Sequence, residues 1–372
     1  PRVRRQRQMC IRDSKDSVGE FPDMMEMRDT AMYVRAGKVA PLSDDVKALF
    51  TSTVDFDGVA YTAPFSGANT MGIMYNKKYF ADNGLEIPKT WDEFITLCQT
   101  IKDKGDMSPL VVGGSDVWHI GFLYDLCYAN DVLESDPDFI EECYKGEKDF
   151  SDANYQKAVT DLAEVLSFAQ DGWASTPDAQ ITTFFVNDMS AMMFSGTHMF
   201  SQINDAAPDF EYGWFAVPDR DGKVNLLGGG TAGEVNADLI SQWVRLGDDL
   251  SATLDEAAFD AFCKYFFSSD VYGAYCEAMA AIPTTVETPK MNTSEQFKSV
   301  LDALSAADYT HLMWNQEVGN RELPPDFRNF TYKTCIEVAQ GSRDVASASS
   351  ELQKTWNVAL QSFNPTTGLG VE

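Results

Sequence analysis

The stretch that decides the fold is residues 61–94, YTAPFSGANTMGIMYNKKYFADNGLEIPKTWDEF. Residues 70–76 have the β-branched and apolar content of a buried strand. Residues 77–82 predict a short helix, because Asn83-Gly84 offers a left-handed stop and Pro88 blocks any continuation. The stretch therefore predicts a buried strand that leads directly into a helix.

A second helix is predicted to begin at Trp91. Thr90 and Glu93 have the spacing of a capping box, in which side chains satisfy backbone N–H groups at a helix start. Apolar residues then recur at helical spacing, at Phe94, Leu97 and Ile101. This stripe gives the helix one apolar face.

The rest of the chain alternates between strand-like and helix-like segments. Strands are predicted at residues 110–112, 191–194 and 212–217. Helices are predicted at residues 118–129, 151–172, 182–187, 254–267, 272–280, 330–340 and 346–360. This alternation is typical of an α/β protein with largely parallel sheets.

Two motifs carry a family resemblance, Tyr75-Asn76-Lys77 and Pro88-Lys89-Thr90-Trp91-Asp92-Glu93. Together they resemble the extracellular solute-binding proteins of ABC importers, in the family 1 carbohydrate group that includes maltose-binding protein. The resemblance covers roughly residues 19–363. It implies a two-lobed periplasmic-binding-protein-like fold (type II), with a ligand cleft between the lobes and hinge crossings.

The resemblance also implies how the chain is divided. Residues 15–68 and 230–310 are expected to form the first lobe, and residues 69–229 and 311–372 the second. Family members have a signal sequence and further βα units before this point, so we expect an N-terminally truncated product with an incomplete first lobe. Residues 1–14 hold five arginines and one acid, and we expect a non-native segment there rather than a genuine basic tail.

The composition limits the class of protein. The 372 residues suffice for two domains, and the net charge of −28 excludes a nucleic-acid binder and disfavours a phosphate-rich ligand. No run of 18 apolar residues predicts a membrane-spanning helix. The seven cysteines include no Cys-x-x-Cys pair, which argues against a zinc site. Proximity alone allows a disulfide between Cys127 and Cys143.

No sequence motif of an enzyme is present. The three histidines are scattered, and HExxH, GxSxG and GxxxxGK[ST] are all lacking. Residues 228–233 are glycine-rich but lack the Lys-Ser/Thr pair that would reach a phosphate and Mg²⁺. We therefore predict no catalytic residue, no metal and no cofactor. A glycoside hydrolase, which needs two carboxylates at a set separation, remains an alternative.

Residues 115–119, Ser-Asp-Val-Trp-His, have the side chains that sugar binding uses. An aromatic face packs on the apolar side of a pyranose, while polar groups hydrogen-bond its hydroxyls. In the maltose-binding group the corresponding loop gives an acid and aromatics to the sugar. The resemblance thus assigns these roles to Asp116 and Trp118, with His119 in place of an aromatic. The alternative for Trp118 is a core tryptophan.

Further ligand contacts follow from the resemblance. Residues 184–200 match the family pattern Gly-x-x-Ala-Met…Gly-x-Trp, in which the tryptophan stacks on the ligand, but His198 stands in its place. Without that flat ring, a smaller or more polar ligand than maltodextrin is expected. The other predicted contacts are Arg28, Asp29, Asn69, Gly229, Gly230 and Arg328.

These patterns predict the extracytoplasmic binding subunit of a carbohydrate ABC importer. It would be a monomer, lipid-anchored at the cell surface or periplasmic, that closes two lobes on one sugar and delivers it to the membrane permease. Two alternatives stay open. One is a binding protein for a non-sugar solute, such as a polyamine or a polyol phosphate, and the other is the hydrolase.

Overall fold

The computed structural model describes residues 24–27, 34, 37–51, 53, 55–56, 58–67, 69–227, 230–231, 234–235, 242–246, 255–311 and 327–361. The chain forms two compact units. The first consists of Pro1–Ala68, Gly233–Glu277 and Ile282–Met291. The second consists of Asn69–Ala232, Ala278–Ala281 and Asn292–Glu372. Residues 1–14, predicted to be non-native, lie outside the described residues.

The second unit is built on a four-stranded sheet. Its strands are β7 (Ser108–Val111), β8 (Ser190–Gly196), β6 (Met71–Asn76) and β9 (Tyr212–Phe215), in that spatial order. β7 and β8 are parallel, but β6 is antiparallel to both β8 and β9. The prediction of largely parallel sheets is therefore wrong here. The chain enters β6 directly from the first unit, whose first segment ends at Ala68. No crossover helix connects β6 to an earlier strand of this sheet, so nothing requires β6 to run parallel to its neighbours.

The opening stretch forms the elements that its sequence predicts. α4 (Lys77–Asn83) ends at Gly84, which has φ 61°, a left-handed conformation that suits glycine. α5 (Trp91–Lys104) begins after Thr90, whose side chain accepts a hydrogen bond from the Glu93 backbone. The Glu93 carboxylate reaches back to the backbone N–H of Lys89 rather than to the N-cap residue itself.

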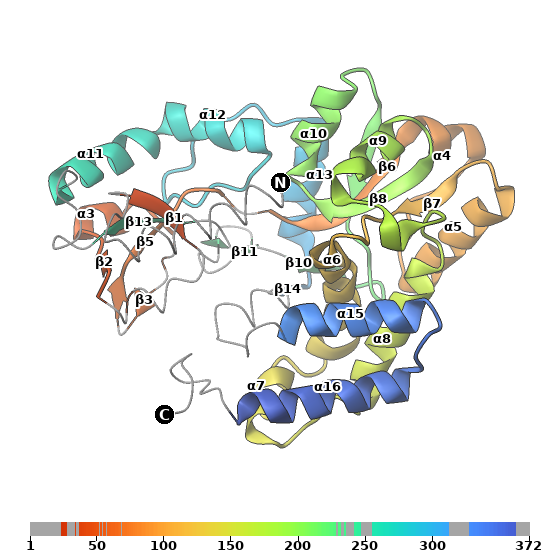
Figure 1. The fold of residues 1–372 in the computed structure, drawn as a ribbon. Helices are drawn as coiled ribbons and strands as arrows, with labels where there is room; N and C mark the ends of the chain where they lie inside the picture. The colour runs from red at the N-terminus through yellow and green to blue at the C-terminus, as the bar shows by residue number, and fades with distance from the viewer. Residues whose placement is uncertain are drawn as a thin grey trace. The chain divides into compact units, whose positions relative to one another are not determined.

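Helices pack around this sheet and bury its main core (Figure 1). Their bounds are α6 (Val117–Tyr128), α7 (Phe139–Lys145), α8 (Ala153–Leu166), α9 (Ile181–Val186), α10 (Met199–Ala206), α15 (Phe327–Ala339) and α16 (Val345–Leu360), with a π-helical turn η1 (Ala129–Leu133) after α6. α6 and α15 approach closely at Gly121, where a Cβ would lie 2.6 Å from the Tyr332 ring.

One predicted helix is shorter in the structure, and another helix was not predicted. The helix predicted over residues 151–172 ends at Leu166, because Phe168 and Gln170 make backbone hydrogen bonds to Leu110 beside β7. α13 (Glu295–Ala306), a helix that the sequence analysis did not predict, belongs to the second unit. It buries three apolar side chains there, and Gln296 donates a hydrogen bond to the carbonyl of Tyr212 in β9 (3.0 Å).

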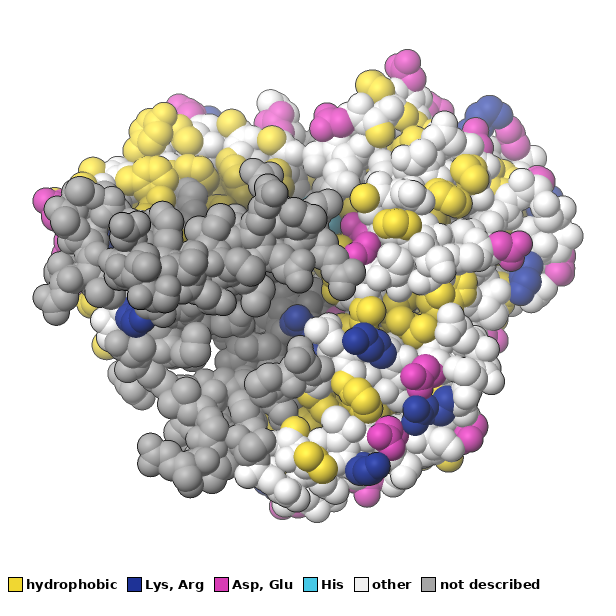
Figure 2. Space-filling view, viewed as in Figure 1, with side chains coloured by type: hydrophobic (Ala, Val, Ile, Leu, Met, Phe, Trp, Pro, Cys, Tyr) yellow, Lys and Arg dark blue, Asp and Glu magenta, His cyan; other side chains and the backbone are white. Residues whose placement is uncertain are grey.

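The first unit has a smaller antiparallel sheet. β13 (Gln242–Leu246) pairs with β1 (Met24–Met27), β2 (Val39–Ala40) and β5 (Thr62–Pro64). Three helices supply core residues: α3 (Asp44–Lys47), α11 (Glu256–Phe266) and α12 (Ser269–Met279). Apolar side chains also gather on the surface over α11 and α12 (Figure 2), where Tyr265 is 67% exposed.

The remaining strands are short. They are β3 (Asp55–Phe56), β4 (Val59–Ala60), β10 (Asn225–Leu227), β11 (Gly230–Thr231), β12 (Glu234–Val235) and β14 (Tyr309–His311). The six described cysteines are buried free thiols, so the disulfide considered between Cys127 and Cys143 is not formed. No helix among the described residues is long and apolar enough to span a membrane.

Candidate functional site

One edge of the second unit's sheet gathers several predicted site residues. The parallel strands β7 and β8 both end at this edge, after Val111 and Gly196. Met71 at the start of β6 pairs with Gly196, so the antiparallel β6 begins at the same edge. Ligands of α/β proteins bind outside the carboxyl ends of such strands. The segments around Asn69, Asp116 and His198 therefore meet where a ligand site is expected.

Asp116 lies between β7 and α6, at the N-cap position of the helix. Its side chain makes no hydrogen bond to its own helix. Its Oδ2 atom instead accepts a hydrogen bond from the backbone N–H of Asp178 (2.9 Å). The carboxylate thus holds residues 173–180, two 3₁₀ turns named η2 (Trp173–Ser175) and η3 (Asp178–Gln180), against the loop after β7.

His119 lies in the first turn of α6, and its ring is enclosed. The side chain is 1% exposed, and Nδ1 lies 2.8 Å from Oδ1 of Asp178. A ring so buried cannot touch a ligand in this conformation. The contact joins His119 to the carboxylate of Asp178, whose backbone N–H donates to Asp116, and the predicted ligand contact of His119 stays a prediction.

Trp118 is partly buried and rests on its own helix. Its ring centroid lies 5.5 Å from that of Phe122 and 5.8 Å from that of His119, both in edge-on geometry. The side chain packs against the main core but is not fully enclosed by it. The predicted contact between Trp118 and a sugar therefore stays a prediction.

Asn69 and His198 are brought together at the same edge. The buried Thr197 donates a side-chain hydrogen bond to Oδ1 of Asn69 (3.1 Å) and a backbone hydrogen bond to the carbonyl of Thr70 (3.1 Å). The next residue, His198, lays its ring on Gly196, where a Cβ would be 2.5 Å from Nδ1. An amide, a hydroxyl and an imidazole thus lie side by side beyond β8.

The other predicted contacts are not joined to this edge. Arg328 is partly buried in the first turn of α15, and no described contact links it to Asp116, Trp118 or His198. Gly230 begins the short strand β11, and its ligand contact stays a prediction. Arg28, Asp29 and Gly229 lie outside the described residues.

Comparison with known proteins decides the family. The profile described as "Bacterial extracellular solute-binding protein" matches residues 19–238. The chain belongs to this family. The family's description agrees with the extracytoplasmic location that the resemblance implied.

Relatives and solved structures carry sugar-binding names. A "Multiple sugar-binding protein" of Streptococcus mutans is 28% identical over 229 residues, which cover 56% of this chain and 50% of that protein. A diacetylchitobiose binding protein of Streptomyces coelicolor is 36% identical over 108 residues, 26% of this chain and 25% of that protein. The structure of a "Chitin oligosaccharide binding protein" matches with a TM-score of 0.78 at 22% identity, covering 93% of this chain and 86% of that chain.

These matches bear on the fold and on the extent of the chain. The solved structures are solute-binding proteins, so this solute-binding protein has the α/β two-lobed fold that its sequence predicts. The family profile and the relatives named above describe binding proteins rather than enzymes. The chain spans between a quarter and a half of the length of those curated relatives.

The sequence analysis did not predict that residues 168–178 of this solute-binding protein lie beside β7, at the same edge of the sheet. The Gln170 side chain accepts a hydrogen bond from the backbone N–H of Val112 (2.9 Å) and donates to its carbonyl (2.9 Å). It also donates to the hydroxyl of Thr176 (3.2 Å). Gly172 and Pro177 were the available signals, because both interrupt a helix. The sequence analysis placed the end of a helix at Asp171-Gly172, whereas α8 ends at Leu166.

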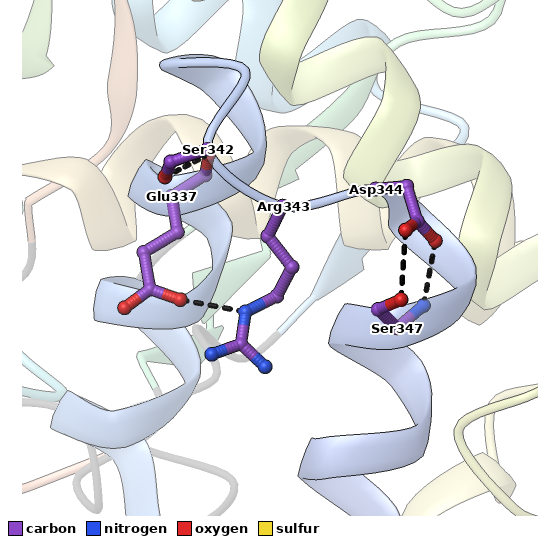
Figure 3. Close-up of a pocket in the computed structure, with 5 residues that line it drawn as sticks. All are labelled: Glu337, Ser342, Arg343, Asp344 and Ser347. Carbon is purple, nitrogen blue, oxygen red and sulfur yellow. Dashed lines mark hydrogen bonds and ion pairs between the residues drawn. The ribbon is translucent and has the colours of Figure 1, made fainter.

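Two polar hollows lie elsewhere on the second unit. One of about 500 Å³ lies at the turn between α15 and α16 (Figure 3), where Arg343 donates to Glu337 (2.7 Å) and Asp344 caps α16. The other, about 140 Å³, is lined by acids and Arg220 near η1. No described group of three or more His, Cys, Asp or Glu residues is arranged to hold a metal ion.

Asp131 beside the second hollow is part of a buried ion network. It pairs with Lys157 and with Arg220 (3.2 Å), and the same two cations pair with Asp161. Burial, together with the nearby charge of Asp161, raises the pKa of Asp131 to about 7. Because two carboxylates share two cations here, we treat the network as structural support for the end of α6.

Proposed function

We propose that this protein is the substrate-binding subunit of an ABC importer for a sugar or oligosaccharide. The single observation that supports this most is the sheet edge of the second unit. The strands that precede Asp116 and His198 end at this edge and the strand that follows Asn69 begins there, so a carboxylate, an imidazole and an amide lie on segments at the same edge. The partly buried Trp118 lies in the first turn of α6, directly after Asp116. Such a mixture suits a pyranose, which has apolar faces and a rim of hydroxyls.

The names of the relatives support the same ligand class. Two curated relatives are named for binding multiple sugars and diacetylchitobiose, and one solved structure is a complex with raffinose. In this proposal, two lobes divided near residues 68 and 230 close on one saccharide by a hinge motion, and the closed form docks on the membrane permease. The protein acts as a monomer held at the cell surface or in the periplasm, and performs no reaction on the sugar.

A thermal-shift screen tests this proposal. The protein is melted with raffinose, diacetylchitobiose and simpler sugars, and in parallel with spermidine and a polyol phosphate. A saccharide at about 100 times its Kd stabilises the native state by roughly 2.7 kcal/mol, which raises the melting temperature visibly.

The same screen separates the alternatives. A response to saccharides, with the sugar recovered unchanged by chromatography, supports the proposal. A shift with spermidine or the polyol phosphate alone would show a binding protein for a non-sugar solute. Turnover of a glycoside, lost on replacing one carboxylate, would show a hydrolase instead.

A further inference from the structure

A second tryptophan, Trp173, lies beside the sheet edge described above. Phe168 accepts a hydrogen bond from the backbone N–H of Leu110 (3.2 Å), and Gln170 donates to the carbonyl of Leu110 (3.0 Å). These bonds place the segment parallel to β7, in a bridge between Leu110 and Ala169. Its carboxyl end therefore reaches the same edge as the ends of β7 and β8. Trp173 follows three residues after Gln170.

Trp173 is held firmly against the loop after β7. Its N–H donates to the carbonyl of Gln170 (3.1 Å), and its carbonyl accepts from the N–H of Gly114 (2.9 Å). The ring lies on the Gly114 backbone, where a Cβ would be 2.5 Å from ring atom Cε3. A larger residue than glycine at position 114 would push the ring away, so this glycine and this tryptophan fit together.

The Trp173 ring is only partly buried, and two carboxylates lie along its segment. Asp116 and Asp178 each use one oxygen in the contacts that join the two loops, Oδ2 of Asp116 and Oδ1 of Asp178. Both carboxylates are only partly buried, and the Asp178 side chain is 25% exposed. A flat apolar face beside carboxylate acceptors suits a neutral sugar ring and repels an anionic solute.

We propose that Trp173 is the stacking platform for a pyranose ring of the ligand, with Asp116 and Asp178 as acceptors for its hydroxyls. This inference rests on the proposed sugar-binding function and deepens it. It also gives the site a flat aromatic surface, although His198 occupies the position where such a ring was expected from the family pattern. The ligand class that fits is a neutral pyranoside without phosphate or carboxylate groups.

Replacing Trp173 tests the proposal. Titration calorimetry with raffinose and diacetylchitobiose compares the unmodified protein with Trp173→Leu, which keeps apolar volume but removes the aromatic face, and with Trp173→Phe. We expect Trp173→Leu to weaken binding about tenfold or more, and Trp173→Phe to retain affinity within about threefold. Met189→Ala is the matched control, because Met189 is 50% exposed directly before β8, at the opposite end of that strand.

Fluorescence separates a ligand contact from a purely structural role. Subtracting the emission of Trp173→Phe from that of the unmodified protein isolates Trp173, and saturating sugar should change this difference signal. Equal sugar affinity in folded Trp173→Leu, or a difference signal that sugar does not change, would overturn the stacking role and leave the proposed function standing. No binding of any saccharide by the unmodified folded protein would overturn both.

Discussion

Among the described residues, the two units differ in the size of the buried apolar cluster that supports them. In the second unit, forty-two described residues form one buried cluster between the sheet and the helices packed on it. In the first unit, the described cluster has eight buried residues, and aromatic side chains such as Tyr265 remain at the surface. Since hydrophobic burial is the main source of stability, the second unit should be the more robust scaffold. The candidate site lies on that unit.

The largest expected effect is in the core of the second unit. Trp356 is fully buried between Tyr144, Phe150 and Phe327, so Trp356→Ala should cost about 3–5 kcal/mol of unfolding free energy. Urea unfolding followed by circular dichroism measures this loss. Val358→Ala on the same helix is the control, because Val358 is 59% exposed and should change stability by less than about 0.5 kcal/mol. Equal losses from the two variants would contradict this view of the core.

The next effect concerns the loop that carries the site. Gly114→Ala should displace the Trp173 ring and cost about 1–3 kcal/mol, because its Cβ would overlap the ring. Sugar affinity should fall with it. Met189→Ala, at the opposite end of β8 and 50% exposed, should leave both stability and affinity nearly unchanged. Unchanged melting and affinity in Gly114→Ala would show that the two loops are not locked together.

The first unit can be probed through a buried hydrogen bond. The Tyr272 hydroxyl lies 2.7 Å from Oγ1 of Thr284, which also donates to the carbonyl of Pro64 (2.8 Å). Tyr272→Phe should cost about 1–3 kcal/mol by leaving Thr284 without that partner. Tyr265→Phe is the exposed control. If the smaller core makes the first unit unfold first, Tyr272→Phe should shift an early transition and leave a later one in place.

A further expected effect is a pH dependence in the second unit. The folded pKa of Asp131 is raised to about 7, from an ordinary value near 4, so the folded state holds a proton there that the unfolded state has released. This contribution is complete at acidic pH and is lost as pH rises towards 7. Asp131→Asn should flatten the fall of melting temperature between pH 5 and pH 8. An unchanged slope in the variant would assign the pH dependence to other groups.

The sequence predicted the elements of the second unit well where local signals were strong. The Asn83-Gly84 stop and the Thr90 cap give α4 and α5 close to their predicted bounds, because caps and left-handed glycines act within a few residues. The direction of β6 and the placement of α13 depend on contacts between residues far apart in the chain. Local patterns carry no information about such contacts, so the prediction of largely parallel strands was wrong and α13 was not predicted.

The candidate site could be predicted only in part, because local signals place some of its residues and contacts between distant segments place the others. Asp116, Asn69 and His198 follow or precede strands, and strand order brings them to one edge. The burial of His119 depends on Asp178, a residue from a distant segment that the sequence gave no reason to place nearby. Trp173 was missed because the residues before it were read as the end of a helix, whereas hydrogen bonds of Phe168 and Gln170 to Leu110 hold them along the sheet.

Hydrogen–deuterium exchange with and without saturating sugar tests most directly the claim that this sheet edge binds a saccharide. The account predicts that raffinose or diacetylchitobiose slows amide exchange in residues 112–119, 170–178 and 196–200. It predicts no change at the turn of residues 341–347, where the larger polar hollow lies. Protection confined to that turn, or bound sugar that leaves all three edge segments unchanged, would contradict it.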